Sequence, residues 1–504
     1  MSLRFSEVSG QFDSTSNKFI NGFFDAHKDH KERVEKYRVL WGWYSGKHWN
    51  RGSVDGSTIV TLNYVKRIVD ELIVFFVKDT FHVSIPEDPN ESSSAKVDRA
   101  FIKTALDDVW DVNCRETFIH EAAQMAAVTG DCFIKISLDT NEDGDSYIRL
   151  DVLPSSMCYP EFYADDKKRV ERLHVMFPKT VETMKFTRFS NSRVEKNATE
   201  TRITWCRETF TDSVIEYYED DVLIEKRDNA LGMIPVVHIK NAPNTDSCYG
   251  WSDVEILVSP NKAMNECITN MSRIVDSYAS PQLFATGMRV EEITKEPGKI
   301  WTTANADADI KVIKALDDLK PSIDYFNTLY RSLFDLSGVP EQAINPSKNV
   351  SNTPGVALHM AYLPLINQRL IKIRQFSDGL KRVNKLILRM MEVLDPTFKS
   401  KLSALGNRKY NTVLSFGEDL PRDEVQAISN DQQKLDMGIT TRKDILLREG
   451  IGPQDADRII NEADTELDKR LSIKAKYSSK ADENGFGKRA KPDPVVQGDK
   501  VSRR

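Results

Sequence analysis

The chain contains 504 residues, of which 40% are hydrophobic and 29% charged, with a formal net charge of −6 and a pI of about 5.9. This length predicts two to four domains with a substantial core, and the acidic balance excludes a DNA-binding protein that relies on global positive charge. No apolar run reaches the roughly 18 residues of a membrane span, and the first residues lack a signal-peptide pattern. We therefore expect a soluble protein that is made in a cytosol and has no membrane partner.

The first 130 residues are predicted to be mainly helical. Residues 1–25 are polar with scattered Phe, which indicates a flexible arm or a strand that docks on a neighbour. A charged helix follows from Asp25 to Leu40 and is expected to be largely exposed. The aromatic cluster Trp41–Trp49 favours a packed hydrophobic corner over a base-stacking surface. Further helices are predicted after Asn63, over Ser94–Trp110 and over Asn113–Thr129, with Gly130 as a C-cap.

From residue 131 the hydrophobic period changes to two, which predicts strands. Asp131–Leu138 and Ser146–Leu153 flank a turn-rich loop and predict a hairpin. The loop Asp139–Asp145 begins like a calcium-binding EF-hand, but the twelfth position is Leu150 and strands surround it, so we expect no metal there. Further strands are predicted over Val170–Phe177, Glu182–Phe189, Glu200–Thr209, Ser213–Tyr218, Asp221–Lys226 and Ile234–Lys240.

Two helices that bracket a small β module are predicted next. The first begins with Ser252 as its N-cap, breaks at Ser259–Pro260 and continues to Ala279. The second has Pro321 at its first position, where the missing amide hydrogen costs nothing. The strands between the two helices are predicted over Gln282–Ala285, Gly298–Thr302 and Asp309–Ile313.

A long helix is predicted from Gly355 to Leu394, because apolar residues recur there in steps of three and four. It follows a polar loop and ends at Asp395–Pro396, where proline removes an amide donor. Pro364 lies inside this helix, so we expect a bend at that residue. The face opposite the apolar stripe is basic. Its cations are Arg369, Lys372, Arg374, Lys381, Arg382, Lys385 and Arg389.

The last hundred residues are predicted to contain a short strand and three helices. Gly438 and Gly450 end the first two of these helices, and the tail from about Leu471 is mildly basic and expected to be disordered. The strand is predicted over Asn411–Phe416 and the helices near Asp423–Asp436, Arg442–Glu449 and Pro453–Lys469.

Sequence motifs that indicate catalysis are missing. There is no G-x-x-x-x-G-K-[ST] loop to hold phosphates, and no G-x-S-x-G, H-E-x-x-H or C-x-x-C motif. Acidic pairs such as Asp107–Asp108 fit solvated turns, although carboxylates brought together by folding could still form a two-metal nuclease site. The six cysteines are widely spaced, which favours buried free thiols. We therefore predict no catalytic residues, no cofactor and no metal.

Six stretches occur in an order that carries a resemblance. They are Tyr44–Trp49, Thr61–Glu71, Gly130–Lys135, Ser337–Glu341, Thr353–Leu358 and Met437–Arg442. In this order the chain, from about Tyr37 to Glu466, resembles the portal (connector) proteins of tailed bacteriophages. It departs from the family at Pro354, where the family often has serine before the Gly-x-Ala-Leu motif.

The resemblance implies an α+β portal fold within a ring, usually of twelve subunits, through which DNA passes. The wing would be α/β, the stem and crown helical, and the clip small and β-containing. The implied parts are residues 1–250 for the wing, 251–279 and 321–338 for the two stem helices, 280–320 for the clip, 339–354 for the tunnel loop, 355–420 for the long kinked helix and its return to the wing, 421–470 for the crown and 471–504 for a basic flexible tail.

The resemblance also implies where DNA and protein partners would meet this chain. A polar loop with one cation suits a sliding duplex, because each neutralised phosphate adds affinity. The basic face of the long helix is then expected to meet acidic surfaces of neighbouring subunits rather than DNA. The DNA-facing residues of the tunnel loop would be Gln342, Asn345, Lys348, Asn349, Ser351 and Asn352. The clip residues that contact the motor or the adaptor would be Phe284, Arg289, Lys299, Trp301 and Lys311.

The implied function is that of a non-enzymatic portal at the capsid vertex of a virion, assembled in the host cytoplasm and used for genome packaging and ejection. The implied partners are further copies of the chain in a dodecameric ring, double-stranded DNA, the large terminase subunit, the major capsid protein and scaffold, and head-completion, adaptor and tail proteins. The competing hypothesis is a phage DNA-processing enzyme, a metal-dependent nuclease or nucleotidyltransferase, with the β region as its catalytic domain. A third is a different ring-forming head or tail component.

Overall fold

The computed structural model describes residues 28–49, 59–78, 81–86, 93–141, 144–185, 198–279, 282–286, 307, 309–313, 319–345, 355–417, 431–448, 457–466 and 468–469. The chain divides into two compact units, Met1–Asp419 and Leu420–Arg504. Helices and strands are mixed along the first unit, so the predicted α+β class is confirmed.

Most of the core residues that precede the first long strand lie in four helices. Asn63 caps the second of them by accepting a hydrogen bond from the Lys66 amide, and Gly130, with φ of 91°, ends the fourth as predicted. The predicted aromatic corner is confirmed, since Trp43 and Tyr44 are buried in the core. The four helices are α3 (Lys28–Tyr44), α4 (Tyr64–Val77), α5 (Ser93–Val112) and α6 (Arg115–Thr129).

Most of residues 28–40 are exposed, as expected for the first helix, but one face of the helix is buried. The buried residues of helix α3 recur in steps of three and four, so they lie on one face of the helix. Two of the buried residues, His30 and Arg33, are polar, and this hid the stripe in the sequence. The other buried residues are Tyr37, Leu40, Trp43 and Tyr44.

Two antiparallel sheets follow. The smaller has the strand order β3-β2-β9 and the larger the sequential order β4-β5-β6-β7-β8. A small cluster with Phe133, Leu173 and Phe210 packs between strands of the two sheets. The strands are β2 (Asp131–Thr140), β3 (Ser146–Leu153), β4 (Cys158–Phe162), β5 (Val170–Lys185), β6 (Ala198–Phe210), β7 (Val214–Glu219), β8 (Val222–Asp228) and β9 (Val236–Lys240), with the 3-10 turn η1 (Ser155–Met157) before β4.

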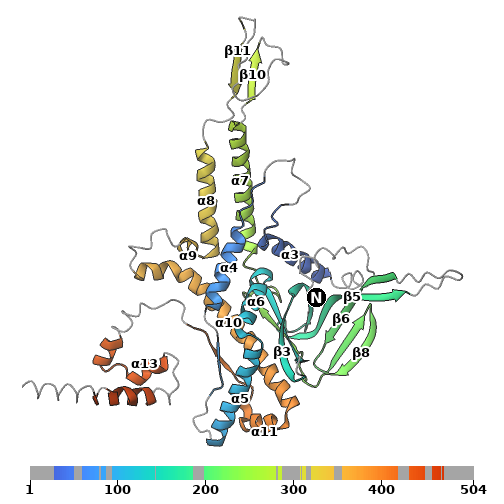
Figure 1. Cartoon of the computed structure of the whole chain (residues 1–504), viewed down its shortest axis with the longest axis vertical. Helices are drawn as coiled ribbons and strands as arrows, with labels where there is room; N and C mark the ends of the chain where they lie inside the picture. The colour runs from blue at the N-terminus through green and yellow to red at the C-terminus, as the bar shows by residue number, and fades with distance from the viewer. Residues whose placement is uncertain are drawn as a thin grey trace, which may run out of the picture. The chain divides into compact units, whose positions relative to one another are not determined.

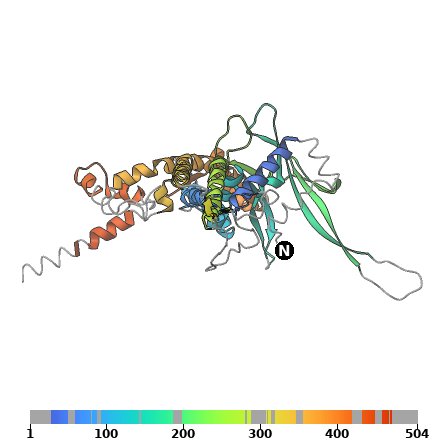
Figure 2. The same cartoon turned by 90° about the horizontal axis from the view of Figure 1, so that it is seen from above.

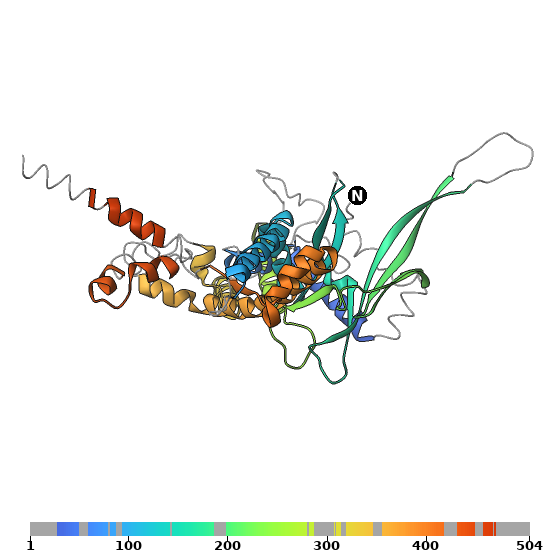
Figure 3. The same ribbon diagram turned by 90° about the horizontal axis from the view of Figure 1, so that it is seen from below.

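The sequence predicted two strands where the structure has the single strand β5. The β4–β5 pairing ends opposite Val175, so Pro178 lies where β5 has only one neighbouring strand. Proline is tolerated at such an edge because no ladder hydrogen bond is lost on the open side. Figures 2 and 3 show β5 and β6 running on past the other strands as a two-stranded arm. Residues 186–189 of the second predicted strand lie outside the described residues.

A helical hairpin leads away from the sheets and carries a short β-hairpin at its far end (Figure 1). The helices are α7 (Glu255–Ala279) and α8 (Lys320–Ser337), and the paired strands are β10 (Gln282–Thr286) and β11 (Asp309–Ile313). Helix α8 has Pro321 in its first turn, as predicted, and ends at Gly338 in the left-handed region. The third predicted strand, Gly298–Thr302, lies outside the described residues.

Two expectations about α7 are wrong. The helix is not broken at Ser259–Pro260 but runs through Pro260. Leu257 before the proline and Met264 after it are buried, and their packing holds this part of the helix in place. Ser252 is not its N-cap, since the helix begins at Glu255. The Ser252 hydroxyl instead accepts from the Val254 amide and donates to the Val128 carbonyl, which ties this turn to the end of α6.

The long helix has the predicted bounds. Helix α10 (Gly355–Leu394) contains Pro364 and is followed by α11 (Pro396–Ala404), which Asp395 caps. The bend at Pro364 stays a prediction. Gly379 allows α10 to lie against β9, because a Cβ there would come within 2.4 Å of the Ile239 side chain. The remaining elements of the first unit are α9 (Glu341–Ile344), the 3-10 turn η3 (Gly406–Arg408) and the paired strands β1 (His82–Ser84) and β12 (Val413–Ser415).

The second unit is helical where it is described. Residues 431–436 and 457–466 are helical and flank α13 (Arg442–Arg448), in agreement with the three predicted helices. Gly438, with φ of 66°, follows the first of them, as expected for a helix stop. Ion pairs Arg442–Asp464 (2.7 Å) and Lys443–Asp457 (2.7 Å) join the second and third helices.

Candidate functional site

Helix α7 is anchored to the core by three polar side chains on one face. Asn261 Oδ1 accepts from the Tyr64 amide (3.1 Å), Asn265 Oδ1 from the Leu62 amide (2.9 Å) and Thr269 Oγ1 from the Val60 amide (3.2 Å). Four residues of helix rise about 6 Å, and two residues of extended chain advance about 6.6 Å. The two periods match over these three hydrogen bonds, so an extended segment before α4 lies along α7. We call this set of side-chain-to-backbone hydrogen bonds the ladder and each hydrogen bond a rung.

This ladder continues to a histidine. Asn265 Nδ2 donates to His48 Nδ1 (2.8 Å), and His48 Nε2 donates to the Trp43 carbonyl (2.8 Å) while its ring stacks on Trp43. Burial lowers the pKa of His48, so the neutral ring that both hydrogen bonds require is favoured. Sequence reasoning missed the ladder. Its signal was a set of polar residues at positions 261, 265 and 269 on an otherwise amphipathic helix.

Two of the five clip residues predicted to contact the motor or the adaptor lie in the β10–β11 hairpin. Phe284 and Lys311 lie directly opposite each other in the antiparallel register, and both side chains are more than half exposed. Lys311 Nζ lies 3.5 Å from Asp309 Oδ2. Arg289, Lys299 and Trp301 lie outside the described residues.

The predicted DNA-facing loop begins with ordered structure. Gln342 lies in α9, and Asn345 follows it, its amide donating to the Glu341 carbonyl. Ala343 and Ile344 pack against the core, so the first residues of this predicted loop are held to the body of the chain. Lys348, Asn349, Ser351 and Asn352 lie outside the described residues.

Several cations of the basic face of α10 bind groups within the chain. Arg369, which is buried, donates to the carbonyls of Phe75 and Gly417 and so satisfies an acceptor in the last turn of α4. Arg389 donates to the Leu231 carbonyl at 2.9 Å, and Arg382 to the His238 carbonyl at 3.1 Å. Arg369 is buried and is therefore not available to a neighbouring subunit, but Arg382 is 47% exposed, so for the exposed cations the expectation stays a prediction. Arg374 and Lys381 are exposed.

Lys372, like Arg369, is a buried cation of this face. Its ammonium donates to Asn241 Oδ1 at 2.6 Å and to Asp253 Oδ2 at 2.5 Å, and its side chain is 8% exposed. Asn241 also donates to the second oxygen of Asp253 and to the Trp251 carbonyl. A buried charge that is paired and hydrogen-bonded in this way fixes the relative position of the segments it joins more than it stabilises the fold. This cluster locks α10 to the segment that enters α7.

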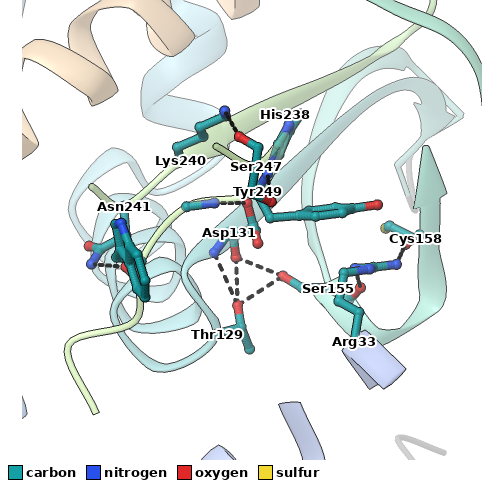
Figure 4. A network of polar contacts seen from close by, with 12 residues as sticks. Arg33, Thr129, Asp131, Ser155, Cys158, His238, Lys240, Asn241, Ser247 and Tyr249 are labelled. Atoms are coloured by element: carbon teal, nitrogen blue, oxygen red, sulfur yellow. Dashed lines mark hydrogen bonds and ion pairs between the residues drawn. The ribbon is translucent and has the colours of Figure 1, made fainter. Parts of the chain in front are cut away.

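A second buried polar centre surrounds Asp131 at the start of β2 (Figure 4). The carboxylate is fully buried and accepts hydrogen bonds from Tyr37 (2.5 Å), His238 Nε2 (2.7 Å) and the Gly250 amide (3.0 Å). Gly130 and Gly250 permit this approach, because a Cβ on either would lie within 2.5 Å of the other's carbonyl oxygen. The centre thus joins α3, β2, β9 and the segment before α7.

Arg33 completes this centre. Its guanidinium donates to the carbonyls of Ser155 (3.1 Å) and Cys158 (2.5 Å) and lies 4.6 Å from the centroid of the Tyr249 ring. Burial lowers the pKa of Arg33, but the oxygens of Tyr37, Tyr249 and Asp131 outweigh this, so the group stays charged. Burial and the Asp131 carboxylate raise the pKa of Tyr37 well above its usual value, which keeps the phenol a donor.

The Asp131 centre contains residue types used in acid–base catalysis, but it does not form an accessible site. Asp131 has no exposed surface, His238 is 9% exposed, and each hydrogen bond joins two parts of the chain. The centre therefore acts as a structural junction.

No group of three or more His, Cys, Asp or Glu in the described part of the chain could hold a metal ion. Among the described residues, no helix has the length and apolar character needed to cross a membrane.

The fold and these contacts define an α+β protein with a projecting helical hairpin, a short β-hairpin at its end and a long helix held to the body by a buried ion pair and by hydrogen bonds from arginine side chains to backbone carbonyls. A family model described as "Phage portal protein, SPP1 Gp6-like" matches residues 25–448. The chain belongs to this family of phage portal proteins, as the sequence resemblance predicted, and the family is structural rather than catalytic. No curated protein matches the chain.

Proposed function

We propose that the chain is the subunit of a ring at the unique capsid vertex, through which double-stranded DNA enters during packaging and leaves during ejection. The observation that carries the proposal is the family match, which spans α7, α8, the hairpin between them and α10. The ring also serves as the docking platform for the terminase motor and later for head-completion and tail proteins. It is assembled in the host cytoplasm and becomes part of the virion.

In this assignment each part of the chain has one role. Helices α7 and α8 form the stem, the segment 280–320 with β10 and β11 forms the clip, and residues 339–354 form the tunnel loop. The elements before residue 250 form the wing, and the helices of residues 421–470 form the crown. The exposed Phe284 supports a binding role for the clip, because aromatic side chains are enriched at protein interfaces.

The tunnel loop is proposed to touch DNA weakly. Lys348 would be the one cation among polar residues, so twelve copies would give a sparse ring of charge along the channel. Sparse neutralisation of phosphates keeps affinity low and lets the duplex slide. The internal hydrogen bonds of Arg369, Arg382 and Arg389 support this view, because they use donors that would otherwise be free to bind phosphates.

Mass photometry and negative-stain imaging of the purified full chain test the proposal. The expected result is a closed ring of about twelve subunits with an axial channel, and no cleavage of DNA in the presence of Mg²⁺. A monomer that cleaves DNA with Mg²⁺ would instead support the nuclease hypothesis. A ring whose channel is too narrow for a duplex would support a different head or tail component.

A further inference from the structure

An apolar pocket of about 480 Å³ lies where α7, α8 and α10 meet. Four of its lining side chains are large, apolar and roughly half exposed. They are Trp251, Ile256, Leu336 and Ile371. Apolar side chains gathered around one hollow in this way mark a surface that binds a partner, and a partly exposed tryptophan is a frequent centre of binding energy.

The charged residues of the pocket are already paired within the chain. Asp253 binds Lys372 at 2.5 Å, and Glu255 binds Lys36 at 2.8 Å. Their charges are thus largely compensated before anything enters the pocket. This favours an apolar occupant over an anion or a cation.

A matching apolar surface lies on the same chain, at the start of α10. Met360 is 64% exposed and Leu363 is 42% exposed. Residues three apart on a helix lie on the same face, so the two side chains form one apolar strip. An amphipathic helix that lays such a strip into an apolar groove is a recurring mode of protein recognition.

This strip cannot enter the pocket of its own chain. Gln368, Ile371 and Lys372 line the pocket from the same helix α10. Met360 precedes Ile371 by eleven residues, or about 16 Å of helix. The helix would have to fold back on itself to place Met360 in that pocket, so this strip can fill such a pocket only in another copy of the chain.

We propose that the start of α10 of one copy, with Met360 and Leu363, binds in the pocket around Trp251 and Leu336 of the next copy. The inference rests on the proposed ring and identifies a contact that closes it. Pocket and strip are different surfaces, so the contact is heterologous and repeats from copy to copy until the ring closes. The tunnel loop precedes this helix directly, so each loop would be positioned by the neighbouring subunit.

Paired lysine substitutions test the contact in the full chain. The pocket variant is Ile256→Lys with Leu336→Lys, the strip variant is Met360→Lys with Leu363→Lys, and the control is Leu138→Lys, an exposed apolar residue on β2. Mass photometry measures assembly, and thermal unfolding checks that each variant is folded. We expect the pocket and strip variants to need at least a tenfold higher concentration to assemble, and the control to assemble like the unmodified chain.

Mixing the two variants gives the decisive result. Each keeps one intact surface, so an equimolar mixture is expected to form a one-to-one dimer that cannot grow. A mixture that stays monomeric overturns the inference, and so does assembly of either variant at the concentration that the control needs. In these cases an unmodified chain that still forms rings leaves the proposed function standing. An unmodified chain that forms no ring contradicts the proposed function itself.

Discussion

At the scale of single residues, the buried polar groups of this protein serve to join distant segments. Asp131 receives hydrogen bonds from α3, from β9 and from the segment before α7. Lys372 binds two groups that lie more than a hundred residues earlier in the chain. Leaving one partner of such a buried group unpaired costs more than the net gain of a usual hydrogen bond.

We expect Asp131→Asn to lower the free energy of unfolding by about 2–4 kcal/mol, because the amide turns an NH₂ group toward donors. Urea unfolding followed by circular dichroism measures the change. Asp139→Asn is the matched control at the other end of β2, where the carboxylate is exposed and pairs with Arg149; we expect a much smaller loss there, because an exposed ion pair contributes little to stability. Equal losses in the two variants would show that the Asp131 centre has no special role.

His174 gives a second prediction at this scale. Its Nδ1 lies 2.9 Å from Thr209 Oγ1 and its Nε2 3.3 Å from Glu161. Burial lowers the pKa of His174 to about 4, with Arg207 and Arg172 adding to this and Glu161 opposing it. The unfolded chain, with a pKa near 6.5, then binds more protons than the folded chain between these values, so stability is complete above about pH 6.5 and falls toward pH 4.

We expect this loss to be of the order of 3 kcal/mol, given about 1.4 kcal/mol for each unit of pKa difference. Urea unfolding at several pH values between 4 and 7 measures it, and His174→Gln should flatten the profile in this range. His120→Gln, on the exposed side of α6, controls for the removal of a histidine. An unchanged slope in the His174 variant would assign the pH dependence to other groups.

At the scale of elements, the hairpin of α7 and α8 depends on the ladder that holds its base. The rungs at Asn261, Asn265 and Thr269 all bind backbone groups of an extended segment that has no strand partner of its own in the described residues. Backbone amides in such a segment have to be satisfied by side chains or water. The ladder therefore orders the segment before α4 and fixes α7 at the same time.

We expect Asn265→Ala to expose the Leu62 amide and to remove the donor to His48 Nδ1, at a cost of about 2 kcal/mol. Hydrogen exchange followed by mass spectrometry should show faster exchange in peptides that cover residues 59–64. Asn270→Ala, at an exposed position of the same helix, serves as the control and should leave these peptides unchanged. Unchanged exchange in the Asn265 variant would mean that the segment is held by other contacts.

At the scale of the whole molecule, the proposed channel loop can be tested apart from ring formation. Because Ala343 and Ile344 pack against the core, a change that begins at Gln342 would disturb the body of the subunit. Replacing residues 346–352 by glycine and serine of equal length leaves α9 intact and removes Lys348. This variant should therefore report on the channel alone.

We expect the replaced loop to leave ring formation unchanged and to reduce DNA packaging or retention several-fold. Mass photometry measures the ring, and protection of packaged DNA from nuclease measures packaging. The same kind of replacement over the β2–β3 turn, residues 141–144, is the control and should package normally. Loss of the ring in the loop variant would place these residues at a subunit interface instead.

The sequence by itself determined the elements whose signal is local. The period of apolar residues set α10 at Gly355–Leu394, and Gly130 and Gly438 ended their helices because each adopts a positive φ. The order of motifs also determined the family. These features need no knowledge of distant contacts, since helix period and capping depend on residues only a few positions apart.

Only the tertiary structure decided the features that depend on partners far along the chain. Pro260 and Pro178 lie inside a helix and a strand because the surrounding packing tolerates them, whereas local rules predicted breaks there. Arg33, Arg369 and Lys372 are buried because distant carbonyl, aromatic and carboxylate groups receive them. The apolar pocket is likewise made by three helices that the sequence places well apart, and a sequence pattern carries no distance between them.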